Sequence, residues 1–330
     1  MNVLVLGGTV FFGRHLVRAL FARGHTVTTF NRGTHDVDRD LPITRIYGDR
    51  TNAIDLARIP AHGWDAVVDP SSAVPEIVDA AVRHLRAAGR YVYISSVSVY
   101  HVDRPAIDED SDVIETLDGD PGADEAFGWR KVMNERRVAA TFGARSVLLR
   151  PGLISGPFDP TDRFTYWPVR FWRGGNVVVP GPPERKVQVI DVRDVADFIV
   201  RSIEAELSGT YNVTTARDAL SMRDVVDACR DGLDLLPAAT WIDGAFLAEA
   251  GCEGWVDLPL WLPPDSVFNG LFRVDVSKAV RAGLTYRPLH ETVRDIRDWY
   301  AASGRTELKA GLTPQKESEL LDAWTAVTSS

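Results

Sequence analysis

Cysteine and lysine are both scarce in this 330-residue sequence. The only cysteines are Cys229 and Cys252, and five lysines stand against 32 arginines. Two cysteines form one bridge at most, which rules out a disulfide scaffold. Free thiols in a reducing cytosol are the simpler interpretation, so we expect a cytoplasmic protein.

Long apolar runs and excess positive charge are also missing. No stretch of 18 apolar residues occurs, so no membrane span is expected. The first eight residues lack a basic segment and predict a buried strand and turn, not a signal peptide. Aspartate and glutamate number 46 against 37 lysine and arginine, for a net charge of −9. This balance disfavours a nucleic-acid partner.

The length and composition are those of a globular protein with about two domains. The hydrophobic fraction is 45% and the charged fraction is 25%, which excludes a disordered or fibrous chain. Up to residue 150, short apolar runs alternate with helical patterns. Strands are predicted at 3–6, 26–30, 44–47, 66–69, 90–95 and 145–149, and helices at the segment that ends at Gly24, at 75–88 and at 124–142. This alternation predicts an α/β fold: a doubly wound parallel sheet of the Rossmann type.

The texture of the sequence changes after residue 150. Proline and glycine become dense, and seven of the nine tryptophans lie beyond residue 160. Further elements are predicted at 191–206, 210–213, 221–231, 240–242 and 290–302, and in the last dozen residues. We expect a Rossmann-type domain over 1–155 and a smaller mixed α/β substrate lobe over 156–330, with about 187–215 returning to the first domain.

A glycine-containing turn follows the first predicted strand. Its glycines allow a pyrophosphate to approach the backbone, and the next helix points its N–H groups at the phosphates. Gly7 and Gly13 lie six residues apart, with Val10 where such turns usually have a middle glycine. The alternative is simply a tight strand-to-helix connection, but the position at the first strand favours a dinucleotide. The candidate cofactor-binding residues here are Gly7, Thr9, Val10, Phe11, Phe12 and Gly13.

The end of the second predicted strand favours NADP(H). An NAD-selective sheet carries a carboxylate at this point, and here the chain has Asn31, Arg32 and Gly33 with no carboxylate until Asp36. The planar guanidinium of Arg32 suits a 2′-phosphate. NAD(H) stays the alternative. After the third strand, Asp49 and the adjoining Arg50 are candidates for the adenine end of the cofactor.

The motifs together resemble the extended branch of the short-chain dehydrogenase/reductase superfamily, the NAD-dependent epimerase/dehydratase family. The matching segments are 7–13, 48–49, 91–100, 128–131, 149–157 and 189–194, in the family's order. The resemblance implies a cofactor bound across the sheet's carboxyl edge and hydride transfer to or from a carbonyl or alcohol carbon. Further cofactor-binding candidates are Ser71, Ser95, Pro151, Gly152 and Leu153, and Ser72 and Ser98 are candidates for substrate binding.

The resemblance assigns the catalytic serine to Ser96 and the catalytic lysine to Lys131. In the family this lysine binds ribose hydroxyls and lowers the pKa of a tyrosine four residues earlier. That position is Phe127, which has no proton to give or take. Three explanations are open: another group such as Tyr100 supplies the proton, catalysis has been lost, or the change from tyrosine was engineered.

Two segments bear on the substrate. The segment 108–125 holds nine carboxylates and neither lysine nor arginine, so it is a solvated loop or an entrance rim that repels anions. Arg163, Tyr166 and Trp167 either stack on a polar ring or pack an irregular loop. No histidine has the spacing of a metal site, so no metal is expected.

We therefore expect an NADP(H)-dependent oxidoreductase of the reductase or epimerase type. Its substrate is a small polyhydroxylated or nucleoside-like molecule. One alternative is a nucleotide-sugar epimerase or dehydratase, with Arg163, Arg170, Arg173 and Arg193 as its support. An alternative of another class is a non-catalytic NADP(H)-sensing protein. A homodimer through the helices at 75–88 and 124–142 is a family-level expectation.

Overall fold

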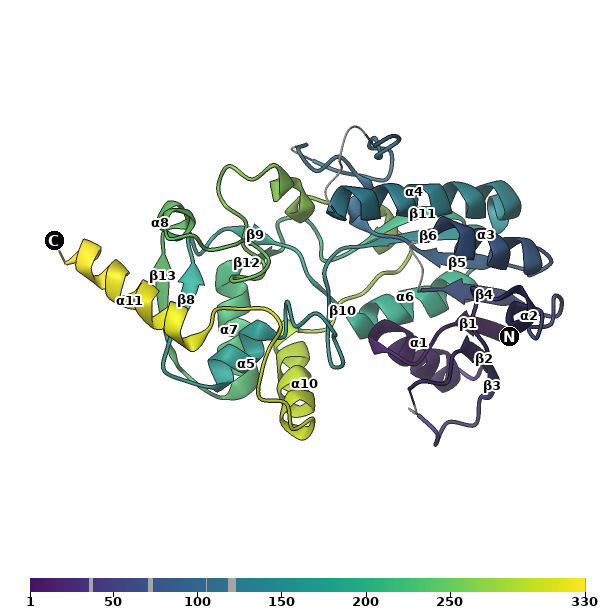
Figure 1. Ribbon diagram of the computed structural model, residues 1–330, viewed down its shortest axis with the longest axis horizontal. Coiled ribbons are helices and arrows are strands. Elements are labelled where there is room, and N and C mark those ends of the chain that lie inside the picture. Colours follow the sequence, from purple (N-terminus) through teal and green to yellow (C-terminus); the bar gives the residue numbers. More distant parts are fainter. Residues whose placement is uncertain (36–37, 71–73, 105, 118–122, 330) are drawn as a thin grey trace. The chain divides into compact units, whose positions relative to one another are not determined.

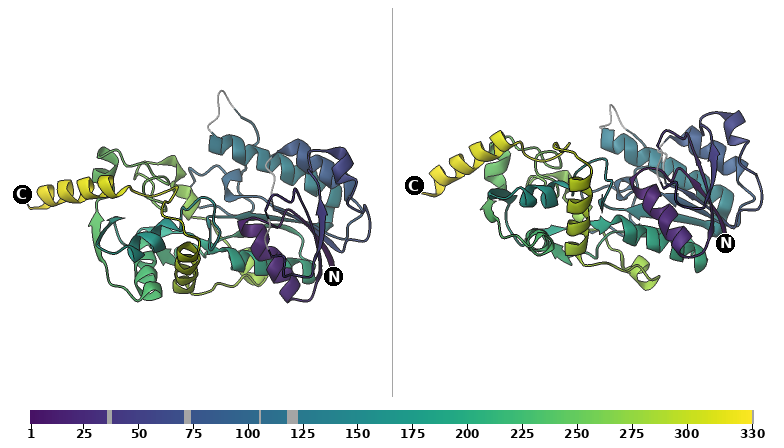
Figure 2. Two further views of the ribbon diagram at one scale, coloured as in Figure 1. Left: turned by 60° about the horizontal axis from the view of Figure 1, so that its bottom comes forward. Right: turned by 90° about the horizontal axis from the view of Figure 1, so that it is seen from below.

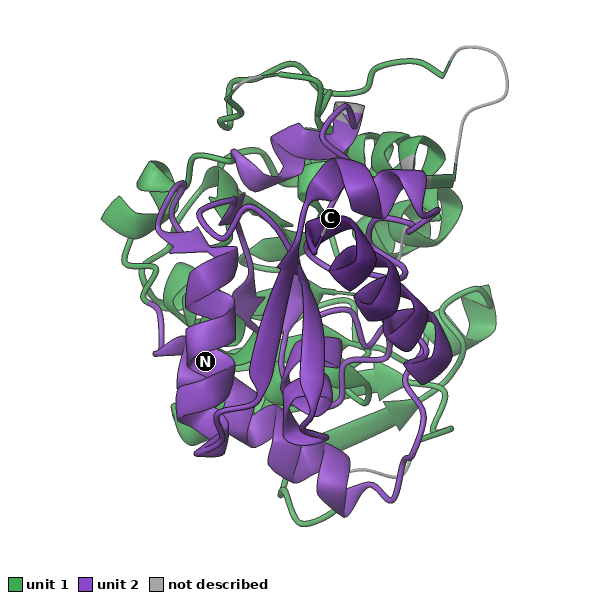
Figure 3. Ribbon diagram, turned by 90° about the vertical axis from the view of Figure 1, so that its left-hand side faces the viewer, with its two compact units in different colours: residues 1–152, 192–214, 274–285 green, residues 153–191, 215–273, 286–330 purple. Residues whose placement is uncertain are grey.

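The computed structural model describes residues 1–35, 38–70, 74–104, 106–117 and 123–329. The chain divides into two compact units (Figure 3). Unit 1 contains residues 1–152, 192–214 and 274–285, and unit 2 contains 153–191, 215–273 and 286–330. The sequence places a boundary at 155 and a return at 187–215, and it gives no sign of the third segment, 274–285. Within the described part of the chain, no helix is long and apolar enough to cross a membrane.

Unit 1 is built on a seven-stranded sheet with the order β11-β6-β5-β4-β1-β2-β3. Every neighbouring pair in it is parallel. The strands are β1 (Asn2–Leu6), β2 (Thr26–Asn31), β3 (Thr44–Tyr47), β4 (Ala66–Asp69), β5 (Tyr91–Ile94), β6 (Ser146–Pro151) and β11 (Gly209–Val213). β1, β4, β5 and β6 are buried almost throughout, as expected for a parallel sheet covered on both faces. The predicted doubly wound sheet is confirmed.

Helices cover both faces of this sheet (Figures 1 and 2). α1 (Phe11–Ala22) packs with α6 (Val192–Glu204), and α3 (Pro75–His84) packs with α4 (Ala123–Phe142). α1 buries Leu16, Val17 and Leu20, which recur at helical spacing. The short elements of the unit are α2 (Ala53–Leu56), η1 (Val97–Val99), η2 (Gly143–Arg145) and α9 (Ser277–Arg281).

Unit 2 has three two-stranded pairings and five α-helices within its described residues. The pairs are β7 (Ile154–Ser155) with β10 (Ile190–Asp191), β8 (Asn176–Pro180) with β13 (Ala238–Ile242), and β9 (Lys186–Val187) with β12 (Leu220–Ser221). The helices are α5 (Tyr166–Trp172), α7 (Met222–Leu233), α8 (Gly244–Glu249), α10 (Leu289–Ala302) and α11 (Pro314–Thr328), with the 3₁₀ turn η3 (Val267–Phe272). Trp167 and Trp261 are fully buried in its core.

A buried carboxylate fixes helix α11 to the rest of unit 2. Glu317 accepts a hydrogen bond from the Val178 backbone N–H at 3.0 Å and one from Arg170 Nε at 2.6 Å. Val178 lies in β8, whose only partner strand is β13. Glu317 therefore accepts from a backbone N–H of an edge strand and also neutralises the Arg170 guanidinium. Leu320 of the same helix adds an apolar contact with the core of unit 2.

We expect Glu317→Ala to lower the free energy of unfolding by about 3 kcal/mol. The change leaves the Arg170 charge and the Val178 N–H without their acceptor, and breaking a buried ion pair is strongly destabilising. Urea unfolding measures the effect, and Glu319→Ala, an exposed glutamate on the same helix, is the matched control. Equal stability of the two variants would contradict this role of Glu317.

Candidate active site

The turn between β1 and α1 requires its glycines. Gly7 and Gly8 have φ angles of 129° and 95°, a backbone region that residues other than glycine rarely adopt. A Cβ at Gly13 would lie 2.8 Å from the Gly8 backbone, so α1 begins in direct contact with the turn. The glycines bring bare backbone to the carboxyl edge of the sheet.

The N-terminus of α1 has no side chain to neutralise it. Its N-cap residue, Val10, makes no side-chain cap hydrogen bond, and the first turn holds no acidic residue. Backbone N–H groups at such a helix start attract anions, because the helix dipole places partial positive charge there. A pyrophosphate suits this arrangement.

The end of β2 is tied to the same turn. Asn31 Nδ2 donates to the Gly7 carbonyl at 3.4 Å, and Asn31 Oδ1 accepts from the Gly33 N–H at 2.9 Å. Arg32, the residue between Asn31 and Gly33, is exposed. The pKa of Asp49 is lowered mainly by the hydrogen bonds that Asp49 accepts from Thr51, and to a smaller extent by the positive charge of Arg32. Arg32 and Asp49 thus lie near one another, beyond the ends of β2 and β3.

Arg50 is paired with a buried carboxylate. Its guanidinium forms a two-pronged ion pair with Asp69, with Nη1–Oδ1 and Nη2–Oδ2 distances of 2.7 Å each. Asp69 ends β4 and is fully buried. Both terminal nitrogens of Arg50 are therefore engaged by Asp69, and a role of Arg50 at the adenine end of a cofactor stays a prediction.

Lys131 and Phe127 lie one turn apart on α4. The Lys131 ammonium is buried, donates to the Ile94 carbonyl at 2.8 Å, and lies 5.6 Å from the centre of the Phe127 ring. Burial lowers the pKa of Lys131 to about 8, although Asp69 and Glu135 act to raise it. Phe127 is 38% exposed, so its ring is partly open to solvent on α4.

Three serines follow β5 beside this lysine. Ser95 is buried, and its Oγ has no hydrogen-bond partner among the described residues. Ser96 Oγ donates to Ser98 Oγ at 3.0 Å and accepts from the Ser98 N–H at 3.1 Å. A buried hydroxyl without a partner is costly, so Ser95 marks a place where a ligand group fits.

Gly128 makes the contact between α4 and this serine segment possible. A Cβ at position 128 would lie 2.0 Å from the Ser98 carbonyl oxygen. Only glycine allows this approach, which holds Phe127 and Lys131 beside Ser96. Sequence analysis placed Gly128 in a matching motif without recognising this contact.

Tyr100 belongs to a separate buried network. Its hydroxyl donates to Asn212 Oδ1 at 2.7 Å and accepts from Arg150 Nη1 at 2.7 Å. Burial raises the pKa of Tyr100 to about 12, and Arg150 only partly offsets it. The hydroxyl is thus engaged inside unit 1, which weakens the hypothesis that Tyr100 supplies the missing proton.

At the end of β6, the candidate residues contact their neighbours through backbone groups. Pro151 is the last residue of the strand, and the Gly152 N–H donates to the Val213 carbonyl at 3.1 Å. A Cβ at Gly152 would lie 2.8 Å from Thr214 Oγ1. Leu153 is the first residue of unit 2 and packs against its core.

The aromatic candidates for substrate stacking are buried. Tyr166 and Trp167 have 1% and 0% exposure and belong to the core of unit 2, where Trp167 Nε1 donates to the Pro259 carbonyl at 3.0 Å. Neither ring has a face for a substrate, so we correct that expectation in favour of packing. Arg163 lies over the Trp255 ring at 5.6 Å.

Two candidate residues and the expectation about metals remain. Ser71 and Ser72 lie outside the described residues. Over the described ranges, no group of three or more histidine, cysteine, aspartate or glutamate side chains is arranged to hold a metal ion.

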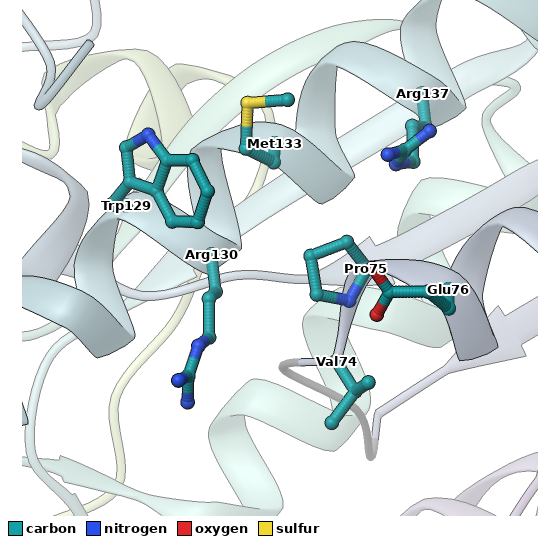
Figure 4. A pocket seen from close by; sticks show the side chains of 7 residues that line it. All are labelled: Val74, Pro75, Glu76, Trp129, Arg130, Met133 and Arg137. Carbon is teal, nitrogen blue, oxygen red and sulfur yellow. The ribbon is translucent and has the colours of Figure 1, made fainter. Parts of the chain in front are cut away.

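A pocket of about 420 Å³ lies between α3 and α4 in unit 1 (Figure 4). Trp129, Arg130 and Met133 line it from α4, and Pro75 and Glu76 line it from the start of α3. Phe127 and Lys131 are not among its lining residues, so this pocket is distinct from the site described above.

Comparison with known proteins identifies the family. The family model described as NAD dependent epimerase/dehydratase family matches residues 3–214, which is more than half of the chain. The chain belongs to this family. The resemblance seen in its motifs to extended short-chain dehydrogenases/reductases is confirmed.

Individual relatives are more distant. The chain is 27% identical over 212 residues to the chloroplast stem-loop binding protein of 41 kDa b from Arabidopsis thaliana, covering 59% of this chain and 53% of that protein. It is 29% identical over 185 residues to a 3-beta-hydroxysteroid dehydrogenase from Mycolicibacterium neoaurum, covering 48% and 49%. The chain thus spans about half the length of the curated relatives it matches.

A solved structure extends the likeness in fold. The Bordetella bronchiseptica enzyme WbmH, solved in complex with NAD⁺, matches with a TM-score of 0.69 and 19% identity, covering 92% of this chain and 99% of that one. The residues of unit 1 fit a nicotinamide dinucleotide on their own evidence, because the glycine turn leads to a helix N-terminus without a side-chain cap and Ser95 Oγ has no partner among the described residues.

We expect Gly128→Ala to destabilise the protein by about 1–3 kcal/mol, because the added methyl group forces α4 away from the Ser98 carbonyl. The displacement also moves Lys131, so NADPH binding should weaken. Thermal unfolding and a fluorescence titration measure the two effects, with Ala139→Ser on the exposed face of α4 as the control. An alanine variant as stable as the parent and as tight for NADPH would refute the steric argument.

Proposed function

We propose that this protein is an NADP(H)-dependent oxidoreductase of the reductase or epimerase type. Its substrate carries a carbonyl or alcohol on a small polyhydroxylated or nucleoside-like molecule. The observation that carries the proposal is Lys131, whose ammonium is fixed at the Ile94 carbonyl beside Ser95 and Ser96. This group lies on the same carboxyl edge as the glycine turn, where open parallel sheets bind their ligands.

The side chains divide the work of binding and orientation. A bound nicotinamide cofactor supplies or takes up a hydride ion. Lys131 donates hydrogen bonds to ribose hydroxyls, for which its charged form has three donors. Ser96 turns its hydroxyl from Ser98 toward the reacting oxygen, where a hydrogen bond stabilises developing negative charge. The buried Ser95 hydroxyl would form a hydrogen bond with the cofactor.

NADP(H) is preferred over NAD(H) because of the residues after β2. Arg32 is exposed, and it makes no hydrogen bond or ion pair with the described side chains. On α1, the guanidinium of Arg14 is bound by Asp38, with Nε–Oδ2 and Nη2–Oδ1 distances of 2.9 and 3.0 Å. Arg32 is thus the guanidinium suited to a 2′-phosphate.

We expect Arg32→Ala to weaken NADPH binding tenfold or more and to change NADH binding little. A hydrogen bond to a charged group contributes roughly 1.5–3 kcal/mol. Calorimetric titration of both cofactors measures this, and Arg86→Ala, an exposed arginine of unit 1, controls for the loss of one charge. Equal loss for both cofactors, or no loss, would remove the assignment of Arg32 to the 2′-phosphate.

Of the two alternative functions, one keeps support from the site and the other loses part of it. The non-catalytic NADP(H)-sensing alternative is favoured by Phe127, which has no hydroxyl, and by the engagement of Tyr100 with Arg150 and Asn212. The nucleotide-sugar alternative needs free arginines in unit 2. Arg170 is bound to Glu317, and Arg173 Nη2 donates to the Thr306 carbonyl at 2.7 Å. This engagement favours a substrate without a diphosphate.

We expect Phe127→Tyr to raise the rate of hydride transfer by ~10²-fold or more and to change substrate affinity little, if the rest of the site is intact. A phenol one helical turn from Lys131 places a proton donor beside a positive charge. Single-turnover NADPH oxidation over a panel of carbonyl compounds and across pH measures this, with Phe127→Leu as the control without a hydroxyl.

If the protein has adapted to phenylalanine, the added hydroxyl does little and Tyr100→Phe does the damage. A Phe127→Tyr protein no faster than the parent, together with a harmless Tyr100→Phe, would contradict both forms of the enzyme hypothesis. Tight NADPH binding without turnover would then favour the sensing function.

The homodimer stays a proposal, with α3 and α4 as the helices that would pair between subunits.

A further inference from the structure

Asp69 is a buried charge that the family motifs do not include. It ends β4, has no exposed surface, and is held on two sides. Arg50 binds both of its oxygens at 2.7 Å, and the Tyr91 hydroxyl donates to Oδ2 at 2.8 Å. Three hydrogen bonds from two residues therefore fix the carboxylate in one orientation.

The sheet register brings Asp69 close to Lys131. Asp69 of β4 pairs with Tyr93 of β5, and Lys131 Nζ lies 5.0 Å from the centre of the Tyr93 ring. The ammonium donates to the carbonyl of Ile94, the next residue along β5. Asp69 and Lys131 thus lie on either side of the end of the same strand.

Lys131 has charged groups of both signs near it. Asp69, at the end of β4, is paired with Arg50. On α4 itself, Glu135 pairs with Arg150 of β6, with Nε–Oε1 and Nη2–Oε2 distances of 2.9 and 2.6 Å. Two buried cations, Lys131 and Arg150, and the partly buried Arg50 therefore share the two carboxylates of Asp69 and Glu135.

Two neutral phenols complete these surroundings. Tyr91 is bound to Asp69, and the Tyr93 hydroxyl accepts from Asn134 Nδ2 at 2.9 Å. Burial raises the pKa of both tyrosines, so they stay protonated. The charge on Lys131 therefore depends on the two carboxylates, against burial and Arg50.

We propose that Asp69 is a positioning residue of this site, which Arg50 and Tyr91 hold in place so that its carboxylate keeps the Lys131 ammonium charged and oriented at the end of β5. The proposal rests on the proposed function, in which that ammonium binds the cofactor ribose. Of the two carboxylates near the ammonium, Glu135 is paired with Arg150 and Asp69 with Arg50 and Tyr91. Burial lowers the pKa of Lys131 to about 8, and Asp69 is the largest influence that raises it.

The test measures the pKa of Lys131 directly in the protein without cofactor. An amine-specific reagent is applied across pH, and the rate of modification of the Lys131 peptide is followed by mass spectrometry. We expect Asp69→Asn to lower the pKa of Lys131 by about one unit or more, as loss of a nearby opposite charge does. Asp69→Glu should restore it, and Asp65→Asn, an exposed carboxylate just before β4, should leave it unchanged.

A merely structural role gives the opposite sign. Loosened packing around Asp69 would expose Lys131 and move its pKa up toward the ordinary 10.5. A rise in Asp69→Asn, or no change, overturns the proposal. Asp69→Asn could fail to fold because it leaves Arg50 unpaired. In that case Arg50→Gln is compared with the double variant Arg50→Gln/Asp69→Asn, in which both partners of the ion pair are neutral. The double variant should have the lower Lys131 pKa by about one unit, and equal values would overturn the proposal.

Protection by NADPH separates this proposal from the function beneath it. The cofactor should slow modification of Lys131 in the parent protein by tenfold or more. Protection without an effect of Asp69→Asn overturns the role of Asp69 and leaves the function intact. An effect of Asp69→Asn without protection shows that the carboxylate acts on Lys131, but it overturns the cofactor-binding role of both residues.

Discussion

The contact of α4 with the end of β5 determines the candidate site. Gly128 lets the helix approach the Ser98 carbonyl, and Lys131 reaches across to the Ile94 carbonyl. One turn later, Glu135 pairs with Arg150 of β6. These three contacts fix the rotation of α4, and with it the place of residue 127 beside Lys131. The site therefore holds Phe127 within 5.6 Å of the Lys131 ammonium.

Three arginines of this protein bind buried carboxylates, and of these Arg150 is itself buried while Arg50 and Arg170 are partly buried. Arg50, Arg150 and Arg170 each bind a buried carboxylate through their planar guanidinium, which keeps its charge when buried. Of the five lysines, all within the described residues, Lys131 alone is buried. Lysine loses its charge on burial more easily than arginine, so its placement among carboxylates is a feature of the site and not of the general composition.

The sequence predicts the Rossmann sheet well because four of its strands, β1, β4, β5 and β6, are buried almost throughout and appear in the sequence as short apolar runs. The strand at 44–47 and that at 66–69 have the predicted ends. The two-residue strands of unit 2, such as β7 and β9, leave no periodic pattern to find. Helix α5 was hidden because Pro168 lies within its first turn and its aromatic residues suggested a binding loop. The Asp69–Arg50 pair was missed because 19 residues separate its partners and only the sheet brings them together.

The central claim is that the carboxyl edge of unit 1 binds NADP(H) with Lys131 at the ribose. A crystal structure of the protein grown with NADPH tests it most directly. The account predicts the pyrophosphate at the N-terminus of α1, the 2′-phosphate at Arg32, and the nicotinamide ribose within hydrogen-bond distance of Lys131 Nζ. Cofactor density elsewhere on the protein, or a ribose beyond the reach of Lys131, would contradict it.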